Sequence, residues 1–271
     1  MRRKILLFGD SITEEAFSSG GWAASLAPPL HPAGYGKVAA SSCFLFRPAL
    51  IGMPAGQLTA ALSAGLGGRV AEGYSGYNTR WAGGDGTALW RMWAPPKAAR
   101  GGGDRLLRAN DACIADRCGG FQSVPLDEYR QNLKAICSSL KERWPDTAVI
   151  LITPPPIDEE GRLKNPYVED NSGLPDRTNE SAGAYARACG EVAKESGIQV
   201  IDIWSKMQQY LGWEKSFLRD GLHFTDGGNR LLFEEVVNSL RKEGLSLQSL
   251  PIDQPLLYDI NRANPLETFK K

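Results

Sequence analysis

The chain has 271 residues, of which 42% are hydrophobic, and this is enough for a sizeable core in one large domain. Its 31 basic and 31 acidic side chains cancel, which argues against nucleic acid or an anionic membrane as the main partner. The five cysteines lack Cys-x-x-Cys spacing, so they favour reduced thiols in a cytoplasmic protein over a disulfide framework or a zinc site.

The hydrophobic pattern predicts neither a membrane span nor a secretion signal. No apolar stretch approaches the length that a membrane-spanning helix needs. Basic residues 2–4 precede an apolar run, as in a signal peptide, but that run stops at Gly9 and is too short.

The first predicted element is a strand over residues 5–8, Ile-Leu-Leu-Phe, which is apolar without alternation. Such a run is typical of a strand buried on both faces of a parallel sheet. Gly9 lets the chain turn, and Asp10 and Ser11 then lie beyond the carboxyl end of the strand, where ligands of parallel sheets bind. An ordinary Gly-Asp-Ser turn has the same sequence, so this stretch by itself does not identify a site.

Regular patterns are interrupted after a first helix that begins near residues 20–26. Residues 27–71 are rich in Ala, Gly, Pro and Ser and show no sustained hydrophobic period. We expect a poorly ordered insertion there rather than a functional lid, because loops of this length are uncommon inside compact domains. A short second strand around residues 70–76 should end in a Gly-Tyr-Ser-Gly turn, which is a weak motif.

The pattern becomes orderly after Asn110. Apolar residues at three- and four-residue steps predict an amphipathic helix over residues 126–144, closed by Pro145. Three prolines after the next strand force the chain across the carboxyl edge of the sheet. The remaining predicted elements are a strand over 147–153, a helix over 177–196, a strand over 198–203, a helix over 231–240 and a surface tail over 245–271.

Two histidines are candidates for the base that a serine nucleophile needs. His31 lies among prolines and glycines, which would not hold an imidazole in one orientation. His223 follows Asp220 by three residues, so in a turn Asp220 can bind Nδ1 and leave Nε2 free to accept a proton. A local hydrogen bond in a loop would explain the pair by itself. Together with the Gly-Asp-Ser strand end, the pair favours a catalytic interpretation.

These motifs resemble the SGNH or GDSL hydrolase superfamily, through residues 8–13, Phe-Gly-Asp-Ser-Ile-Thr, and Asp220-Gly221-Leu222-His223. The resemblance covers most of residues 4–25, 73–82 and 109–240. Further stretches resemble its isoamyl acetate-hydrolysing esterase branch: Gly20-Gly21-Trp22, residues 73–81, Asn110-Asp111-Ala112, residues 152–156, Arg177-Thr178-Asn179-Glu180 and Trp204-Ser205-Lys206-Met207-Gln208.

The resemblance implies an α/β fold and a serine esterase. The hydrolase domain would cover residues 1–244 as three α/β/α layers around a flavodoxin-like, mostly parallel sheet. Ser11 would attack the ester carbonyl, with His223 as general base and then acid, and Asp220 orienting the imidazole. Asp10 would be a supporting residue.

The resemblance also implies the oxyanion donors and the substrate class. The N–H groups of Ser11 and Gly76 and the side chain of Asn110 would hold the oxyanion. No metal or organic cofactor is implied, and the substrate would be a small ester with a short acyl group, such as an acetate. Neither the physiological ester nor the oligomeric state follows from the sequence.

Residues 83–108 depart from the family pattern, which places a buried apolar strand there before a Gly-x-Asn-Asp turn. This chain instead has three glycines at 101–103, Arg105 within the strand, and Arg108 where a glycine is expected. A central strand tolerates such residues poorly. We therefore expect Asn110 to be held loosely and the enzyme to be slow or marginally stable.

Two alternatives stay open. Because of the atypical third strand, the chain could be a catalytically impaired or inactive relative of these hydrolases. A metal-dependent phosphoesterase could use Asp10, Asn110, Asp220 and His223, although one suitable histidine is too few for most two-metal sites.

Overall fold

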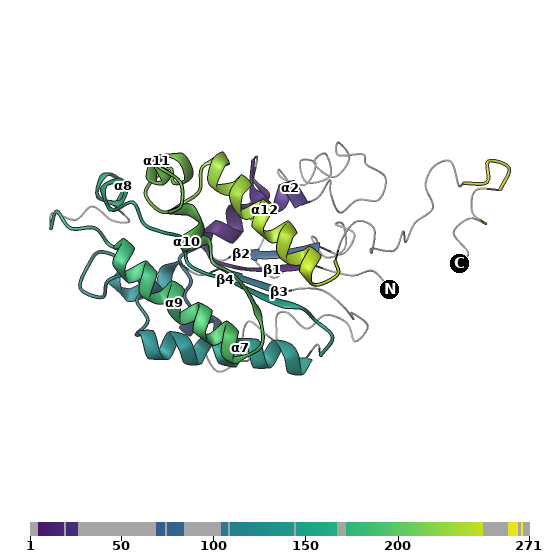
Figure 1. Cartoon of the computed structure of the whole chain (residues 1–271), viewed down its shortest axis with the longest axis horizontal. Helices are drawn as coiled ribbons and strands as arrows, with labels where there is room; N and C mark the ends of the chain where they lie inside the picture. Colours follow the sequence, from purple (N-terminus) through teal and green to yellow (C-terminus); the bar gives the residue numbers. More distant parts are fainter. Residues whose placement is uncertain are drawn as a thin grey trace, which may run out of the picture.

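A computed structural model describes residues 5–18, 20–26, 69–73, 75–83, 104–107, 109–143, 145–166, 172–245, 260–264 and 267. Their centre is a five-stranded parallel sheet in the order β2-β1-β3-β4-β5 (Figure 1). The strands are β1 (Ile5–Gly9), β2 (Arg69–Gly73), β3 (Asp104–Leu107), β4 (Val149–Ile152) and β5 (Gln199–Ile201). This order is that of the flavodoxin-like, doubly wound sheets, so the predicted fold class is confirmed.

Helices cover both faces of the sheet, with α7 and α9 on one face and α2 and α12 on the other (Figure 1). Within the described residues no helix is long and apolar enough to cross a membrane. The helices are α1 (Ser11–Glu14), η1 (Glu15–Phe17), α2 (Trp22–Leu26), α5 (Thr79–Gly83), η2 (Asn110–Ala112), η3 (Gly120–Gln122), α7 (Leu126–Arg143), α8 (Glu159–Lys164), α9 (Asn179–Glu195), α10 (Ile203–Met207), α11 (Trp213–Phe217) and α12 (Asp226–Lys242).

Strand β4 shows how the two helical layers share one sheet. Ile150 and Ile152 belong to the hydrophobic cluster that contains α2 and α12, whereas Val149 and Leu151 belong to the cluster that contains α7 and α9. All four side chains are buried, as the two-residue period of a strand covered on both faces requires. The apolar run of this strand is therefore explained by burial on both sides.

The predicted helices after Asn110 are confirmed as α7, α9 and α12. The third strand forms despite its atypical sequence, since β3 lies in the middle of the sheet and pairs with β1 and β4. Backbone hydrogen bonds on both sides hold these four residues, and such bonds do not depend on the side chain of Arg105. The rest of the atypical stretch, residues 84–103 and Arg108, lies outside the described residues.

Strand β2 also corrects the expected insertion over residues 27–71, because residues 69–71 belong to the strand and pair with β1. Residues 27–68 lie outside the described part, so the insertion itself stays a prediction. Most of the tail over 245–271 lies outside it as well, and the described residues 261–264 are exposed.

The loop that carries Asp220 and His223 packs, backbone against backbone, on the start of α8. Asp158 donates its N–H to the carbonyl of Gly221 over 3.1 Å. Gly221 has φ of +85°, and a Cβ there would lie 2.4 Å from the Asp158 carbonyl oxygen and 2.5 Å from the Arg162 nitrogen. Only glycine fits this contact, which fixes where the loop lies relative to the sheet.

We predict that Gly221→Ala lowers the free energy of unfolding by more than about 2 kcal/mol, because the new methyl group meets backbone atoms at a positive φ. Denaturant unfolding measures the loss. Gly190→Ala is the matched control, since Gly190 lies within α9 with open space around its Cβ position. That control should stabilise the protein by about 0.5–1 kcal/mol. A Gly221→Ala protein as stable as the wild type would contradict the packing argument.

Candidate active site

Asp10 holds the turn that presents Ser11. Strand β1 ends at Gly9, and α1 begins at Ser11. The buried carboxylate of Asp10 caps this helix, since Oδ1 accepts from the N–H of Ile12 over 3.0 Å. Its Oδ2 accepts from the N–H of Ala109 over 2.6 Å. One side chain therefore links the serine turn to the turn that follows β3.

Ser11, His223 and Asp220 form a continuous chain of polar contacts, although Ser11 and His223 lie 212 positions apart in the sequence. Ser11 Oγ lies 2.9 Å from His223 Nε2, and His223 Nδ1 lies 2.7 Å from Asp220 Oδ2. Such an arrangement can pass a proton from a hydroxyl group to an imidazole whose other nitrogen faces a carboxylate.

Asp220 is fixed by its own loop. Its Oδ1 accepts from the backbone N–H groups of Leu222, over 3.0 Å, and His223, over 2.8 Å. Burial opposes ionisation, but the hydrogen bond from the His223 ring, the charge of that ring and the two backbone bonds together hold the pKa of Asp220 well below its usual range. Asp220 is therefore a carboxylate at neutral pH and can favour a positive charge on the ring.

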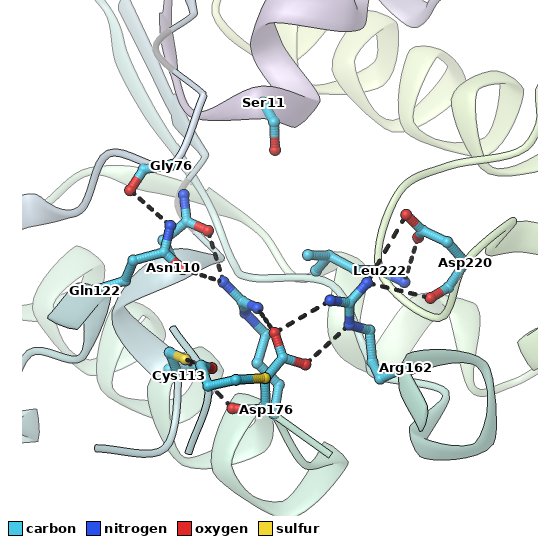
Figure 2. Close-up of polar contacts among 12 residues, drawn as sticks. Ser11, Gly76, Asn110, Cys113, Gln122, Arg162, Asp176, Asp220 and Leu222 are labelled. Atoms are coloured by element: carbon cyan, nitrogen blue, oxygen red, sulfur yellow. Dashed lines mark hydrogen bonds and ion pairs between the residues drawn. The ribbon is translucent and has the colours of Figure 1, made fainter. Parts of the chain in front are cut away.

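Gly76 lies in the loop that follows β2, with φ of +78°. Its carbonyl oxygen accepts from Gln122 Nε2 over 3.0 Å. Figure 2 shows Gly76 and Asn110 on one side of Ser11, and Asp220 on the other. The structure thus brings Gly76, Asn110 and Ser11 to one edge of the sheet, as the sequence predicts for the ends of parallel strands.

Asn110 is buried and held through both ends of its amide group. Its Nδ2 donates to the carbonyl oxygen of Tyr77 over 2.8 Å, and its Oδ1 accepts from Arg177 Nη2 over 2.8 Å. The expectation that Asn110 is held loosely is therefore wrong. The first bond uses one of the two Nδ2 hydrogens, so a second hydrogen remains for another acceptor.

Four buried polar residues around this site were not identified from the sequence: Gln122, Arg162, Asp176 and Arg177. Arg177 belongs to a stretch that resembles the esterase branch, but nothing in its spacing indicates that it contacts Asn110, 67 positions away. The one signal in the sequence is the adjacent Asp176-Arg177 pair, whose opposite charges can be buried together.

The described residues contain no group of three or more His, Cys, Asp and Glu side chains that could hold a metal ion. They include four cysteines without a disulfide bond. Burial raises the pKa of Cys113, that of Cys137 to about 11 and that of Cys189 to about 12. These three cysteines therefore stay protonated at neutral pH and are poor nucleophiles.

Comparisons with known proteins show what the whole chain is similar to. The profile of the GDSL-like Lipase/Acylhydrolase family matches residues 7–231. A GDSL esterase/lipase of Arabidopsis thaliana is 49% identical over 99% of this chain and 98% of its own length. The isoamyl acetate-hydrolyzing esterase 1 homolog of Homo sapiens is 32% identical over 97% of this chain and 90% of its own. A solved lipase/acylhydrolase from Enterococcus faecalis shares the fold, with a TM-score of 0.53, 22% identity, and coverage of 93% of this chain and 100% of its own.

We predict that Asp220→Asn weakens the dependence of stability on acidic pH. A carboxylate whose folded pKa is depressed stabilises the protein above its unfolded pKa, ~3.9, and this contribution is lost progressively as pH falls from about 5 through the lower folded pKa. Between about pH 5 and pH 3, urea unfolding should therefore show a shallower loss of stability in Asp220→Asn than in the wild type. Asp116→Asn, at a mostly exposed carboxylate, should keep the wild-type slope. Identical slopes for all three proteins would contradict the assignment.

Proposed function

Because this chain belongs to the GDSL-like lipase/acylhydrolase family of carboxylic ester hydrolases, we propose that it hydrolyses small esters with a short acyl group through an acyl-enzyme on Ser11. The observation that carries the proposal is the contact of Ser11 Oγ with His223 Nε2, with Asp220 on the other ring nitrogen. This contact supplies the base that a serine hydroxyl needs.

In the first half-reaction His223 Nε2 takes the proton of Ser11 as Oγ bonds to the ester carbonyl carbon. The carbonyl electrons move onto oxygen and form a tetrahedral oxyanion. Asp220 stabilises the imidazolium through its contact with Nδ1. When the intermediate collapses, the bond to the alcohol oxygen breaks, His223 gives its proton to that oxygen, and the acyl group stays on Ser11.

In the second half-reaction water replaces the alcohol. His223 takes a proton from the water as the water oxygen attacks the acyl carbon, and a second oxyanion forms. The bond to Ser11 Oγ then breaks, and His223 returns the proton to that oxygen. The carboxylic acid leaves, and the serine is regenerated without a metal or organic cofactor in any step.

The oxyanion needs donors at ~2.7–3.1 Å from the position where negative charge develops. We assign this role to the backbone N–H groups of Ser11 and Gly76 and to the second Nδ2 hydrogen of Asn110. The loops after β1, β2 and β3 supply one donor each, and the fixed amide of Asn110 supports its assignment. Donors that are already in place need no reorganisation as the charge forms.

The short acyl group is proposed from relatives. Proteins named isoamyl acetate-hydrolyzing esterase 1 homolog in cattle and humans are each 32% identical to this chain over 97% of its length. Their name points to an acetate of a small alcohol. A series of p-nitrophenyl esters tests this assignment, and kcat/KM should fall as the acyl chain lengthens from acetate to octanoate. A preference for octanoate would contradict it.

We predict that Ser11→Ala and His223→Ala each lower kcat for p-nitrophenyl acetate by about 10⁴-fold or more, because they share one proton transfer. The double variant should be scarcely worse than either single variant. Ser18→Ala, at an exposed serine, should keep wild-type activity. Circular dichroism checks that each variant is folded.

The same proteins separate the alternative functions. A serine-reactive phosphonate should label the wild type but not Ser11→Ala, and a chelator should leave turnover unchanged. Folded wild-type protein that shows neither turnover nor labelling would indicate an inactive relative. Chelator-sensitive hydrolysis of phosphate esters would indicate a phosphoesterase.

We further predict that Asn110→Ala lowers kcat by ~10²–10³, about 2.7–4 kcal/mol of transition-state stabilisation, with little change in KM. The reason is that the oxyanion exists only in the transition state and the tetrahedral intermediate. Asn261→Ala, at an exposed asparagine, is the control and should leave kcat unchanged. An equal rise in KM with unchanged kcat would indicate that Asn110 binds the ground state instead.

A further inference from the structure

Arg177 donates to two neutral amide oxygens, one on Asn110 and one on Gln122. Its Nη2 lies 2.8 Å from Asn110 Oδ1 and 2.9 Å from Gln122 Oε1. Gln122 Nε2 in turn donates to the carbonyl oxygen of Gly76. One guanidinium group therefore contacts, directly or through Gln122, two of the three residues to which we assign oxyanion donors.

Asp176 holds Arg177 from the other side and joins it to Arg162. Asp176 accepts from Arg162 Nε over 3.0 Å, from Arg162 Nη2 over 3.1 Å and from Arg177 Nη1. Arg162 Nη1 also donates to the carbonyl oxygen of Asp220 over 3.4 Å. Figure 2 shows this network as a line of dashed contacts from Gly76 to Asp220.

The network is deeply buried, because Arg162, Asp176 and Arg177 are 4%, 2% and 2% exposed. Two arginines share one aspartate, so the three residues together carry one positive charge. Ion pairs of this kind add little stability on average, since desolvation offsets their attraction. Their presence here points to a role other than holding the fold together.

A guanidinium group can only donate hydrogen bonds, and this fixes the orientation of both amides. If Asn110 rotated its amide by half a turn, its NH₂ group would face the NH₂ group of Arg177, donor against donor. The oxygen of Asn110 must therefore face Arg177, and its nitrogen must face Tyr77 and the reacting ester. For the same reason the oxygen of Gln122 faces Arg177 and its nitrogen faces the carbonyl oxygen of Gly76.

The positive charge of Arg177 also changes the donor strength of Asn110. A charge-assisted bond to Oδ1 draws electron density toward that oxygen and leaves the Nδ2 hydrogens more positive. A more positive hydrogen binds an oxyanion more strongly, and the effect is larger in a buried site than in water.

We propose that Arg177, anchored by Asp176 and Gln122, is a positioning residue that orients and polarises the amide of Asn110 for oxyanion binding. This inference rests on the proposed function, because it concerns the oxyanion of the same ester hydrolysis. Arg177 itself does not touch the reacting atoms. It acts through Asn110, and Gln122 holds the guanidinium group as the second acceptor of Nη2.

A double-mutant cycle tests the proposal. Arg177→Lys keeps the positive charge but loses the planar set of N–H donors of the guanidinium group. Arg177→Gln loses the charge. Each should lower kcat for p-nitrophenyl acetate by about tenfold with little change in KM, and Arg177→Gln should be the more severe. In an Asn110→Ala background the same substitutions should lower kcat by less than about threefold, because their target is gone.

Arg130→Lys is the matched control, at a surface arginine that pairs with Glu191 on α9 and should leave kcat unchanged. A merely structural role for Arg177 would lower kcat by the same factor with and without Asn110, and that result would overturn the proposal. If both Arg177 variants fail to fold, the cycle is run with Gln122→Met, which removes the second acceptor of Nη2. Coupling of this variant to Asn110 supports the proposal, and independence overturns it.

Different results would overturn the proposed function and the role of Arg177. If Ser11→Ala keeps activity, the proposed function is wrong. If activity depends on Ser11 and Asn110 but the loss at Arg177 is independent of Asn110, only the role of Arg177 is wrong.

Discussion

Parallel pairing of β1 with both β2 and β3 is the constraint on which the site depends. Gly9 pairs with Gly73 on one side and with Leu107 on the other, so the three strands end level with one another. Ser11, Gly76 and Asn110 follow these paired positions within two or three residues. The pairing of the strand backbones therefore brings three segments that are distant in sequence to one edge of the sheet. Contacts among the side chains of these segments are not required for this.

The charges around this edge are distributed so that each has a defined partner. Asp220 faces the imidazole of His223, whereas Arg177 binds the oxygen of the Asn110 amide, the proposed oxyanion donor. Arg162 and Asp176 link the two sides, because Asp176 accepts from both arginines and Arg162 Nη1 lies 3.8 Å from Asp220 Oδ2. Such preorganised charges act strongly in a buried site.

The features of the fold and site that depend on neighbouring residues could be predicted from the sequence. The strand that ends at Gly9 and the spacing of Asp220 and His223 could be read from a few neighbouring residues, as could the amphipathic helix α7. The formation of β3 could not, since it depends on backbone pairing with β1 and β4 rather than on its own side chains. The network around Arg177 could not either, because Asn110 and Gln122, two of its acceptors, lie 67 and 55 positions away in the sequence.

Asp10 has a consequence for partial unfolding. Its carboxylate caps α1 and also binds the N–H of Ala109, so the serine turn and the asparagine turn share one buried acceptor. A fluctuation that frees Ala109 leaves a buried charge without one of its donors, which also disfavours the cap. The two turns therefore belong to one cooperative unit. A molecule that opens locally here would displace Ser11, the proposed nucleophile, and Asn110, the proposed oxyanion donor, together.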